Sequence, residues 1–450
     1  MFSSLNKDKA LTRVKITLKV LCILMFGLGI FFTISMLYPL TMISVILAVG
    51  IAQVSGFLIF LYLLSTVLLL KLTPKLRARK IKREEERAPN QLIMQKNILR
   101  KVIVVIGLGL VFVNILPLIF TPSAIVDAEN EFADVFGENW RDKIPEEVEL
   151  YFQPSQFNLF NYFFGFPQPD CNIDRDITYL DLGNGKYFNF DAYYPKETSR
   201  QLPGNRSIII KIHGGAWTAG DKSEFHTLWI NKYLAAQGYI VFDIQYGLLD
   251  VADAFDMLPT PKNVLGNYTL HDMIYHIGYF TKIVEDQLID RYNANNGSVF
   301  IMGGSAGGHL TGVVGLGYND PYFAGNFSSA LNLKGIIPMY PANDAKHVAS
   351  GDRETLIPGT PETNPLAFEK FTPSKLTDAN DPPALIFQGL NDWMTPPTNS
   401  RTIELNMESS GVDAIVLEFP FASHANDYIT SNNFAQIWLY YLERFLYLEQ

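Results

Sequence analysis

Residues 298–317 read SVFIMGGSAGGHLTGVVGLG. An apolar run of strand length leads into a cluster of small residues, and a helical pattern follows the cluster. Within it, Gly303-Gly304-Ser305-Ala306-Gly307 matches G-x-S-x-G, and a preceding strand and a following helix are the context that this motif requires. The turn is so tight that the serine takes strained backbone angles, and larger neighbours would clash. We therefore predict that Ser305 is a nucleophile exposed above a sheet.

The same glycines could belong to a phosphate-binding loop. However, no Lys-Ser/Thr pair follows them as in a P-loop, and no G-x-G-x-x-G is followed by an acid after the next strand. The serine turn is therefore the favoured interpretation.

A nucleophilic serine needs a base and an acid that orients the base, in the chain order Ser, acid, His. Three histidines follow Ser305. His309 is one helical turn away and is expected to pack on that helix, and His347 precedes the best acid. His424 lies in a loop just after the apolar strand expected at 414–419, so we predict that His424 is the base.

The best acid is Asp392, which follows the strand expected at 384–388. Its rivals Asp378, Asp381 and Asp413 all precede a strand. They would lie at the amino ends of the strands, whereas sites in open α/β sheets form at the carboxyl ends. The predicted triad is therefore Ser305, Asp392 and His424.

Residues 212–217 read Ile-His-Gly-Gly-Ala-Trp and follow the strand expected at 207–213. This is an H-G-G-x-W form of the H-G-G-G stretch that supplies oxyanion-hole N–H groups. We predict Gly215, Ala216 and Ala306 as these donors and His213 as a structural residue. Trp217 is a candidate for the wall of an acyl or aryl pocket, although core packing is the commoner use of such a ring.

From about residue 176 the chain alternates short apolar strands with helices. The strands are expected at 187–193, 207–213, 239–244, 298–302, 335–340, 384–388 and 414–419, and the helices at 224–237, 269–290, 306–317, 398–410 and 432–448. Such alternation predicts a mainly parallel sheet with helices on both faces. We take 176–450 as the catalytic domain. Segment 121–175 is acidic and then aromatic, and is either a linker with a flap or an arm packed on the core.

Residues 1–120 carry three segments long enough to span a bilayer, at about 16–37, 41–70 and 102–120. The run 107–110 within the last segment is expected to serve helix packing. Basic residues gather before the first segment and in the loop 71–101. The positive-inside rule then places the N-terminus and that loop in the cytoplasm and everything after residue 120 outside. The lipid bilayer is therefore an expected partner.

Charge divides the chain in the same way. Residues 1–120 hold 16 Lys/Arg and 4 Asp/Glu, and residues 121–450 hold 20 and 41. An acidic domain argues against nucleic acid as a partner. Two cysteines exclude a disulfide scaffold and a cysteine-rich zinc module, and no other metal motif is present.

Four stretches together resemble the α/β-hydrolase superfamily: HGGAWTAGDKSEF (213–225), IMGGSAGGHLTG (301–312), GLNDWMTPP (389–397) and FASHAND (421–427). They are most similar to the hormone-sensitive-lipase-like carboxylesterases and to the feruloyl/acetyl-xylan-esterase-like group. The resemblance covers roughly 185–448, with Ala216 at the fourth position of H-G-G-G. It implies hydrolysis of a small-molecule, lipid or glycan ester by a serine carboxylesterase without a cofactor.

Other functions remain open. A hydrolase-fold acyltransferase would use the same triad and pass the acyl group to a cell-surface glycan or lipid. Isoprenylcysteine methylesterase and kynurenine formamidase share H-G-G-x-W, but both act on cytoplasmic substrates. An adhesion domain on an inactive hydrolase scaffold would be expected to lose the serine or the histidine.

Overall fold

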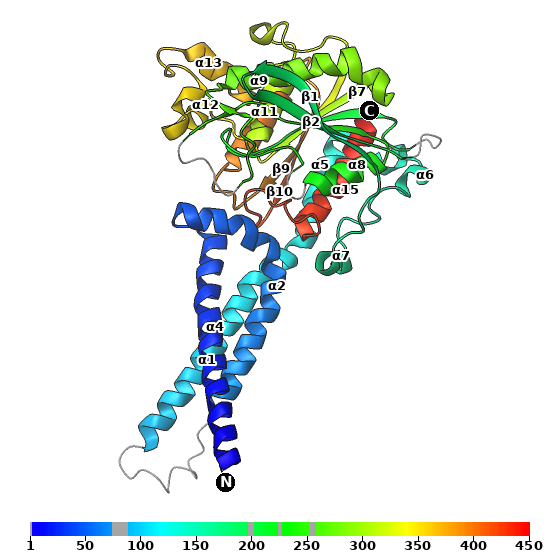
Figure 1. Ribbon diagram of the computed structural model, residues 1–450. Helices are drawn as coiled ribbons and strands as arrows, with labels where there is room; N and C mark the ends of the chain where they lie inside the picture. Colours follow the sequence, from blue (N-terminus) through cyan, green and yellow to red (C-terminus); the bar gives the residue numbers. More distant parts are fainter. Residues whose placement is uncertain (1, 74–88, 197–201, 224–226, 252–257) are drawn as a thin grey trace. The chain divides into compact units, whose positions relative to one another are not determined.

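A computed structural model describes residues 2–73, 89–196, 202–223, 227–251 and 258–450 (Figure 1). The chain divides into two compact units, residues 1–120 and 121–450. We describe each unit by itself.

In its described residues, 2–73 and 89–120, the first unit contains the long helices α1 (Phe2–Leu37), α2 (Met42–Leu72) and α4 (Pro89–Ile119). Three helical stretches are long and apolar enough to cross a membrane, namely Ala10–Leu37, Met42–Leu72 and Asn97–Phe136, which confirms the three apolar helices expected. Of the predicted loop 71–101, residues 74–88 lie outside the described residues. Residues 89–101 are helical rather than loop, because Pro89 suits a first helical turn and good helix formers follow it.

Small and polar residues lie where these helices meet. A Cβ on Gly29 would come within 2.6 Å of the Tyr62 ring, and one on Gly107 within 2.0 Å of Thr66 Oγ1. The Asn114 side chain donates a hydrogen bond to Thr33 Oγ1 across 3.0 Å. Small residues that let backbones approach, with polar side chains between them, are typical of helix contacts in membranes.

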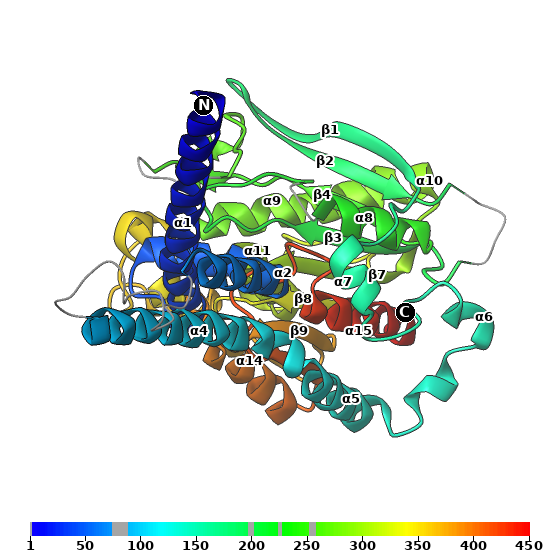
Figure 2. The same cartoon turned by 90° about the horizontal axis from the view of Figure 1, so that it is seen from below.

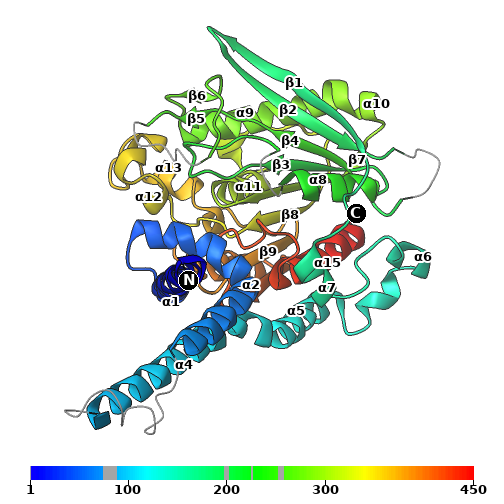
Figure 3. The same ribbon diagram turned by 60° about the horizontal axis from the view of Figure 1, so that its bottom comes forward.

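The second unit is built on an eight-stranded sheet of order β1-β2-β4-β3-β7-β8-β9-β10 (Figures 1 and 3). The strands are β1 (Asn172–Gly183), β2 (Lys186–Tyr194), β3 (Ser207–Ile212), β4 (Ile240–Ile244), β7 (Asn295–Gly304), β8 (Leu333–Met339), β9 (Ala384–Gly389) and β10 (Ala414–Phe419). From β4 to β10 every neighbour is parallel, while β2 runs antiparallel to both β1 and β4. A short separate pair is formed by β5 (Leu248–Leu249) and β6 (Leu265–Gly266).

Helices cover both faces of this sheet (Figure 2). One face packs on α9 (Leu270–Ile283), α11 (Ala306–Leu316) and α14 (Thr398–Ser409), and the other on α8 (Thr227–Ala236) and α15 (Asn433–Glu449). Short turns α10 (Ile289–Tyr292), α12 (Ala345–Val348) and α13 (Pro365–Lys370) complete the connections. The predicted fold class is confirmed.

Strand β1 was not among the expected strands. It is an edge strand that pairs only with β2, its register with β2 is broken by three irregularities, and Tyr179 is its one buried residue. With charged residues scattered between its apolar ones, the segment lacks the alternation by which half-buried strands are recognised. Residues 224–226 of the helix expected at 224–237 lie outside the described residues.

Segment 121–175 folds as part of the second unit. Helix α5 (Thr121–Phe136) buries Phe132 against Trp140 and Tyr441, at ring-centroid distances of 5.3 and 4.6 Å. The short α6 (Glu146–Glu149) and α7 (Leu159–Phe164) follow. The Gln153 and Asn158 N–H groups donate to side chains of α15, across 2.5 and 2.8 Å. The segment is therefore an arm packed on α15.

Candidate active site

Ser305 stands at the turn between β7 and α11. Its φ of +59° lies in the left-handed region, which is costly for a residue with a side chain and is found where function requires it. The surrounding backbone makes the flanking glycines necessary. A Cβ on Gly303 would lie 2.6 Å from the Ile212 carbonyl oxygen, and one on Gly307 would lie 2.2 Å from the same oxygen.

The three side chains of the predicted triad meet at the carboxyl ends of three strands. His424 Nε2 is 2.8 Å from Ser305 Oγ, and His424 Nδ1 is 2.7 Å from Asp392 Oδ2. Both Asp392 and His424 are buried. The distances are those of hydrogen bonds, so the histidine lies between the hydroxyl and the carboxylate.

The carboxylate of Asp392 is held from several sides. Oδ1 accepts hydrogen bonds from the N–H groups of Met394 and Thr395, both across 2.8 Å. Thr395 Oγ1 lies 2.9 Å from Oδ2. The loops that carry the acid and the base are themselves joined, because the Asn391 N–H donates to the Ala422 carbonyl across 2.9 Å. These hydrogen bonds fix the orientation of the Asp392 carboxylate.

The loop after β3 lies against the serine turn. A Cβ on Gly214 would come within 2.8 Å of the Gly304 carbonyl oxygen and 3.3 Å of Ser305 Cβ. The three residues that follow all have positive φ: +120° at Gly215, +53° at Ala216 and +65° at Trp217. In the described part of the chain, the N–H groups of Gly215, Ala216 and Ala306 donate no hydrogen bond.

The other two histidines near the site are tied to the scaffold. His213 Nδ1 is 2.8 Å from the Gly214 carbonyl oxygen, and its ring stacks on Tyr246. His309 Nε2 is 2.8 Å from the Phe371 carbonyl oxygen, and burial lowers the pKa of His309 to about 4. Both rings are buried, and in the described part of the chain His424 is the histidine within hydrogen-bond distance of Ser305 Oγ.

Three residues of the site were not found from the sequence. Tyr340, at the end of β8, packs the edge of its ring on His424 at 4.8 Å and donates its hydroxyl to Asp427 Oδ1 across 2.8 Å. Thr395 Oγ1 lies 3.1 Å from His424 Nδ1. The one signal available was position, because Thr395 lies three residues after Asp392, Asp427 three after His424, and Tyr340 follows an apolar strand.

A cavity of about 40 Å³ opens at Ser305. Its lining is mixed: Lys211, His213, Thr227, Tyr340 and Tyr428 bring polar groups, and Ile212, Leu258, Met339 and the backbone at Gly214 and Gly304 bring apolar surface. Trp217 is not among the lining residues. Its ring is buried in the core, edge-on to His309 at 5.3 Å and beneath the Arg353 guanidinium at 5.2 Å.

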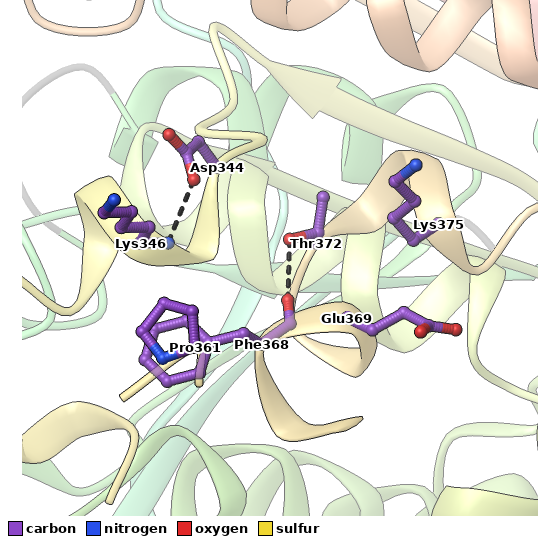
Figure 4. A pocket seen from close by; sticks show the side chains of 7 residues that line it. All are labelled: Asp344, Lys346, Pro361, Phe368, Glu369, Thr372 and Lys375. Carbon is purple, nitrogen blue, oxygen red and sulfur yellow. Dashed lines mark hydrogen bonds between the residues drawn. The ribbon is translucent and has the colours of Figure 1, made fainter. Parts of the chain in front are cut away.

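A second, wider hollow of about 500 Å³ lies elsewhere, between α12, α13 and the turn after α13 (Figure 4). Figure 4 shows Asp344, Lys346, Glu369 and Lys375 around it, with Phe368 and Pro361 at its floor. It contains none of the triad residues. In the ranges that the structure describes, no group of three or more His, Cys, Asp or Glu side chains could hold a metal ion.

In comparisons with known proteins, this chain is similar in sequence to esterases. The BD-FAE family model matches residues 190–407, a range that includes Ser305 and Asp392 and ends before His424. The probable carboxylic ester hydrolase LipM of Mycobacterium tuberculosis is 27% identical over 273 residues, which are 58% of this chain and 58% of LipM. Esterase LipQ of the same organism is 26% identical, over 65% of this chain and 68% of LipQ.

Among solved structures, esterase B from Lactobacillus rhamnosis has a TM-score of 0.46 and 16% identity, covering 68% of this chain and 89% of its own. A truncated carbohydrate esterase from gut microbiota has a TM-score of 0.44 and 18% identity, covering 62% and 99%.

Proposed function

We propose that this chain, which belongs to the α/β-hydrolases and is similar to their carboxylesterases, is a membrane-anchored serine carboxylesterase. The observation that carries the proposal is the continuous hydrogen-bonded series from Ser305 Oγ through His424 to Asp392, with distances of 2.8 and 2.7 Å. A serine hydroxyl is a weak nucleophile by itself, and it gains reactivity from an adjacent oriented base.

In the proposed reaction, Ser305 Oγ attacks the ester carbonyl carbon while His424 Nε2 takes the hydroxyl proton. Asp392 keeps the proton of His424 on Nδ1 and stabilises the imidazolium that forms. When the tetrahedral intermediate collapses, His424 gives its proton to the departing alcohol and leaves an acyl group on Ser305. A water molecule, activated by the same histidine, then attacks the acyl-enzyme and releases the acid.

The N–H groups of Gly215, Ala216 and Ala306 are proposed to hold the oxyanion. They come from the loop after β3 and from the first residue of α11, which flank Ser305 on two sides. Their lack of partners in the described part of the chain supports this role, since such groups are usually satisfied. Backbone donors fixed before the reaction need no rearrangement, and one such donor is typically worth about 10²–10³ in rate.

The cavity at Ser305 favours a small acyl group over a long chain, because it measures about 40 Å³. The names of the relatives support an ester substrate in general. Whether the ester belongs to a glycan, a lipid or a small molecule is the question that a substrate series answers.

Membrane anchoring is proposed from the first unit. Its helices are long and apolar enough to cross a bilayer, and basic residues cluster in the first half of α1 and between residues 71 and 101. The positive-inside rule then puts the N-terminus in the cytoplasm and the hydrolase unit, 121–450, outside it. Reporter fusions at the two ends of the chain test this orientation, since opposite compartments are expected for residues 1 and 450.

The test of the proposed activity uses the full chain in detergent with 4-nitrophenyl esters from acetate to palmitate. We expect hydrolysis of the short-chain esters, a steep fall of kcat/KM with chain length, and loss of activity in Ser305→Ala by at least about 10³-fold. Equal activity of Ser305→Ala and the parent chain would contradict the proposal. Rates that rise toward palmitate would overturn the preference for small acyl groups but keep the esterase.

A further inference from the structure

Lys211 is a buried lysine that lines the cavity at Ser305. It is the fifth residue of β3, two positions before His213, and it is 4% exposed. Alternation along the strand places its side chain on the face opposite to Ile210 and Ile212, which belong to the apolar core. The residue lines the same cavity as Ser305, Tyr340 and Tyr428.

Two carboxylates lie near this lysine, and both already have hydrogen-bond donors. Asp243 is the register partner of Lys211 on β4, and its Oδ2 accepts from the Ser223 N–H and the Asn231 amide across 2.8 and 2.7 Å. Asp427 accepts the Tyr340 hydroxyl. Burial lowers the pKa of Lys211, and the charges of Asp243 and Asp427 act to raise it.

Within the described part of the chain, no hydrogen-bond or ion-pair partner of the Lys211 amine is found, and a neighbouring lysine shows how unusual this is. Lys222 is also buried, and its Nζ lies 2.6 Å from Asp176 Oδ1 and 2.8 Å from Asp191 Oδ1. The two buried lysines therefore differ, since Lys222 has carboxylates at contact distance and Lys211, among the described residues, does not. An unpaired buried ammonium costs free energy unless something else accepts its hydrogen bonds.

We infer that Lys211 is a specificity-determining residue that donates a hydrogen bond to an oxygen of the substrate, on the part of the ester that enters the cavity beside Ser305. The inference rests on the proposed esterase function and adds a substrate class to it: esters whose buried group carries a carboxylate, hydroxyl or ether oxygen. A purely hydrocarbon group in this cavity would leave the amine without an acceptor, and sites built for a polar group reject the analogue that lacks it.

The test compares two esters of the same length and shape, 4-nitrophenyl methoxyacetate and 4-nitrophenyl butyrate, on the full chain and on Lys211→Met. For each protein, the kcat/KM of the oxygen-bearing ester is divided by that of the hydrocarbon ester. The two esters differ in intrinsic reactivity, but this difference is the same for both proteins and cancels when their ratios are compared. A second pair, 4-nitrophenyl hemisuccinate and valerate, probes a charged oxygen in the same way. Lys211→Arg retains a cationic donor and serves as the matched variant.

We expect Lys211→Met to lower at least one of the two ratios by about tenfold to a hundredfold, as for a lost hydrogen bond to a charged donor, and Lys211→Arg to lower it less. A change in the methoxyacetate ratio indicates a neutral oxygen, and a change confined to the hemisuccinate ratio indicates a carboxylate. Unchanged ratios for both pairs would overturn the inference.

Should Lys211→Met fail to fold, the parent chain still decides the question. For each pair, the kcat/KM ratio of the oxygen-bearing ester to the hydrocarbon ester is compared with the ratio of their rates of alkaline hydrolysis. If the enzymatic ratio does not exceed the chemical ratio for either pair, the inference is overturned. The proposed function fails separately, if hydrolysis of all four esters is the same in Ser305→Ala as in the parent chain.

Discussion

The two units of this chain distribute polar and apolar side chains in opposite ways. In the helical unit, large apolar side chains such as Val105 and Phe112 are 70% and 62% exposed, while Thr33, Gln53 and Asn114 are buried. In the hydrolase unit, the apolar residues of the central strands are buried on both faces of the sheet. Both units obey the same physical rules of burial. The opposite distribution of polar and apolar side chains therefore indicates that the outer surfaces of the two units face different solvents.

Buried polar groups also serve different purposes in the two units. In the helical unit some of them link two helices, as Asn114 and Thr33 do, and others, such as Gln53, bond to a carbonyl of their own helix. In the hydrolase unit one group of buried polar side chains lies at Ser305, where His424 is hydrogen-bonded to both Ser305 and Asp392. The comparison predicts that substitutions of polar or small residues between the helices of the first unit affect stability, and that substitutions of the buried polar residues around Ser305 affect catalysis.

The largest effect is expected from Asp392→Asn. The amide keeps the volume of the side chain but removes the charge and no longer holds the His424 proton on Nδ1, so kcat should fall by about 10⁴-fold with little change in the melting temperature. Asp378→Asn is the control, because Asp378 is exposed at the amino end of β9. If Asp392→Asn and Asp378→Asn lowered kcat to a similar extent, the prediction that Asp392 is the carboxylate that orients His424 would be contradicted.

The helical unit gives a matched pair of glycines. In Gly107→Ala the new Cβ would lie 2.0 Å from Thr66 Oγ1, whereas at Gly109 no atom lies within 4 Å. Overpacking typically costs about 1–3 kcal/mol, so Gly107→Ala should lower the melting temperature of the helical unit in detergent while Gly109→Ala does not. Thermal scans of the full chain, followed by circular dichroism, make the measurement. Equal melting temperatures for the two variants would contradict the close packing of α2 and α4.

Thr395→Val tests a residue that positions the acid. Its hydroxyl lies 2.9 Å from Asp392 Oδ2, and the valine leaves that oxygen with one donor fewer. One hydrogen bond to a charged group is worth about 1.5–3 kcal/mol, so we expect kcat to fall by roughly tenfold or more with KM nearly unchanged. The exposed Thr402→Val on α14 should leave both constants as they are, and a change in KM alone for Thr395→Val would speak for substrate contact instead.

The smallest effect concerns the outside of the hydrolase unit, where Glu404 lies among other acidic residues. Burial, together with the charges of Glu131, Glu408 and Glu418, raises the pKa of Glu404 to about 7. The folded state therefore binds the proton more tightly than the unfolded chain, and this carboxyl costs stability increasingly as the pH rises from about 4.5 to 7. In Glu404→Gln this cost is absent.

The difference in melting temperature between Glu404→Gln and the parent chain should therefore become more positive from pH 5 to pH 8, by a few degrees at most. Differential scanning at the two pH values measures it. A difference that stays constant or becomes more negative with rising pH would show that the pKa of Glu404 is not raised in the folded unit.

Much of the hydrolase unit could be predicted from local sequence. The strands at 207–212, 384–389 and 414–419 are short apolar runs between turn residues, and they were expected within one residue of their bounds. Strand β1 was missed because an edge strand, buried at Tyr179 alone, carries no clear alternation. Helix α5 was missed because its partners, Tyr441 among them, lie some 300 residues away in the chain.

By itself, the sequence determined which residues are candidates for the chemistry, because a strained serine turn tolerates only small neighbours and because chain order and strand ends restrict the acid and the base. It also determined the three apolar segments, since length and composition suffice for them. Only the tertiary structure decided which groups meet: Thr395 and Tyr340 at the triad, Trp217 in the core and not in the cavity wall, and Lys211 at the cavity. These positions depend on contacts between distant strands and loops, and no local pattern encodes them.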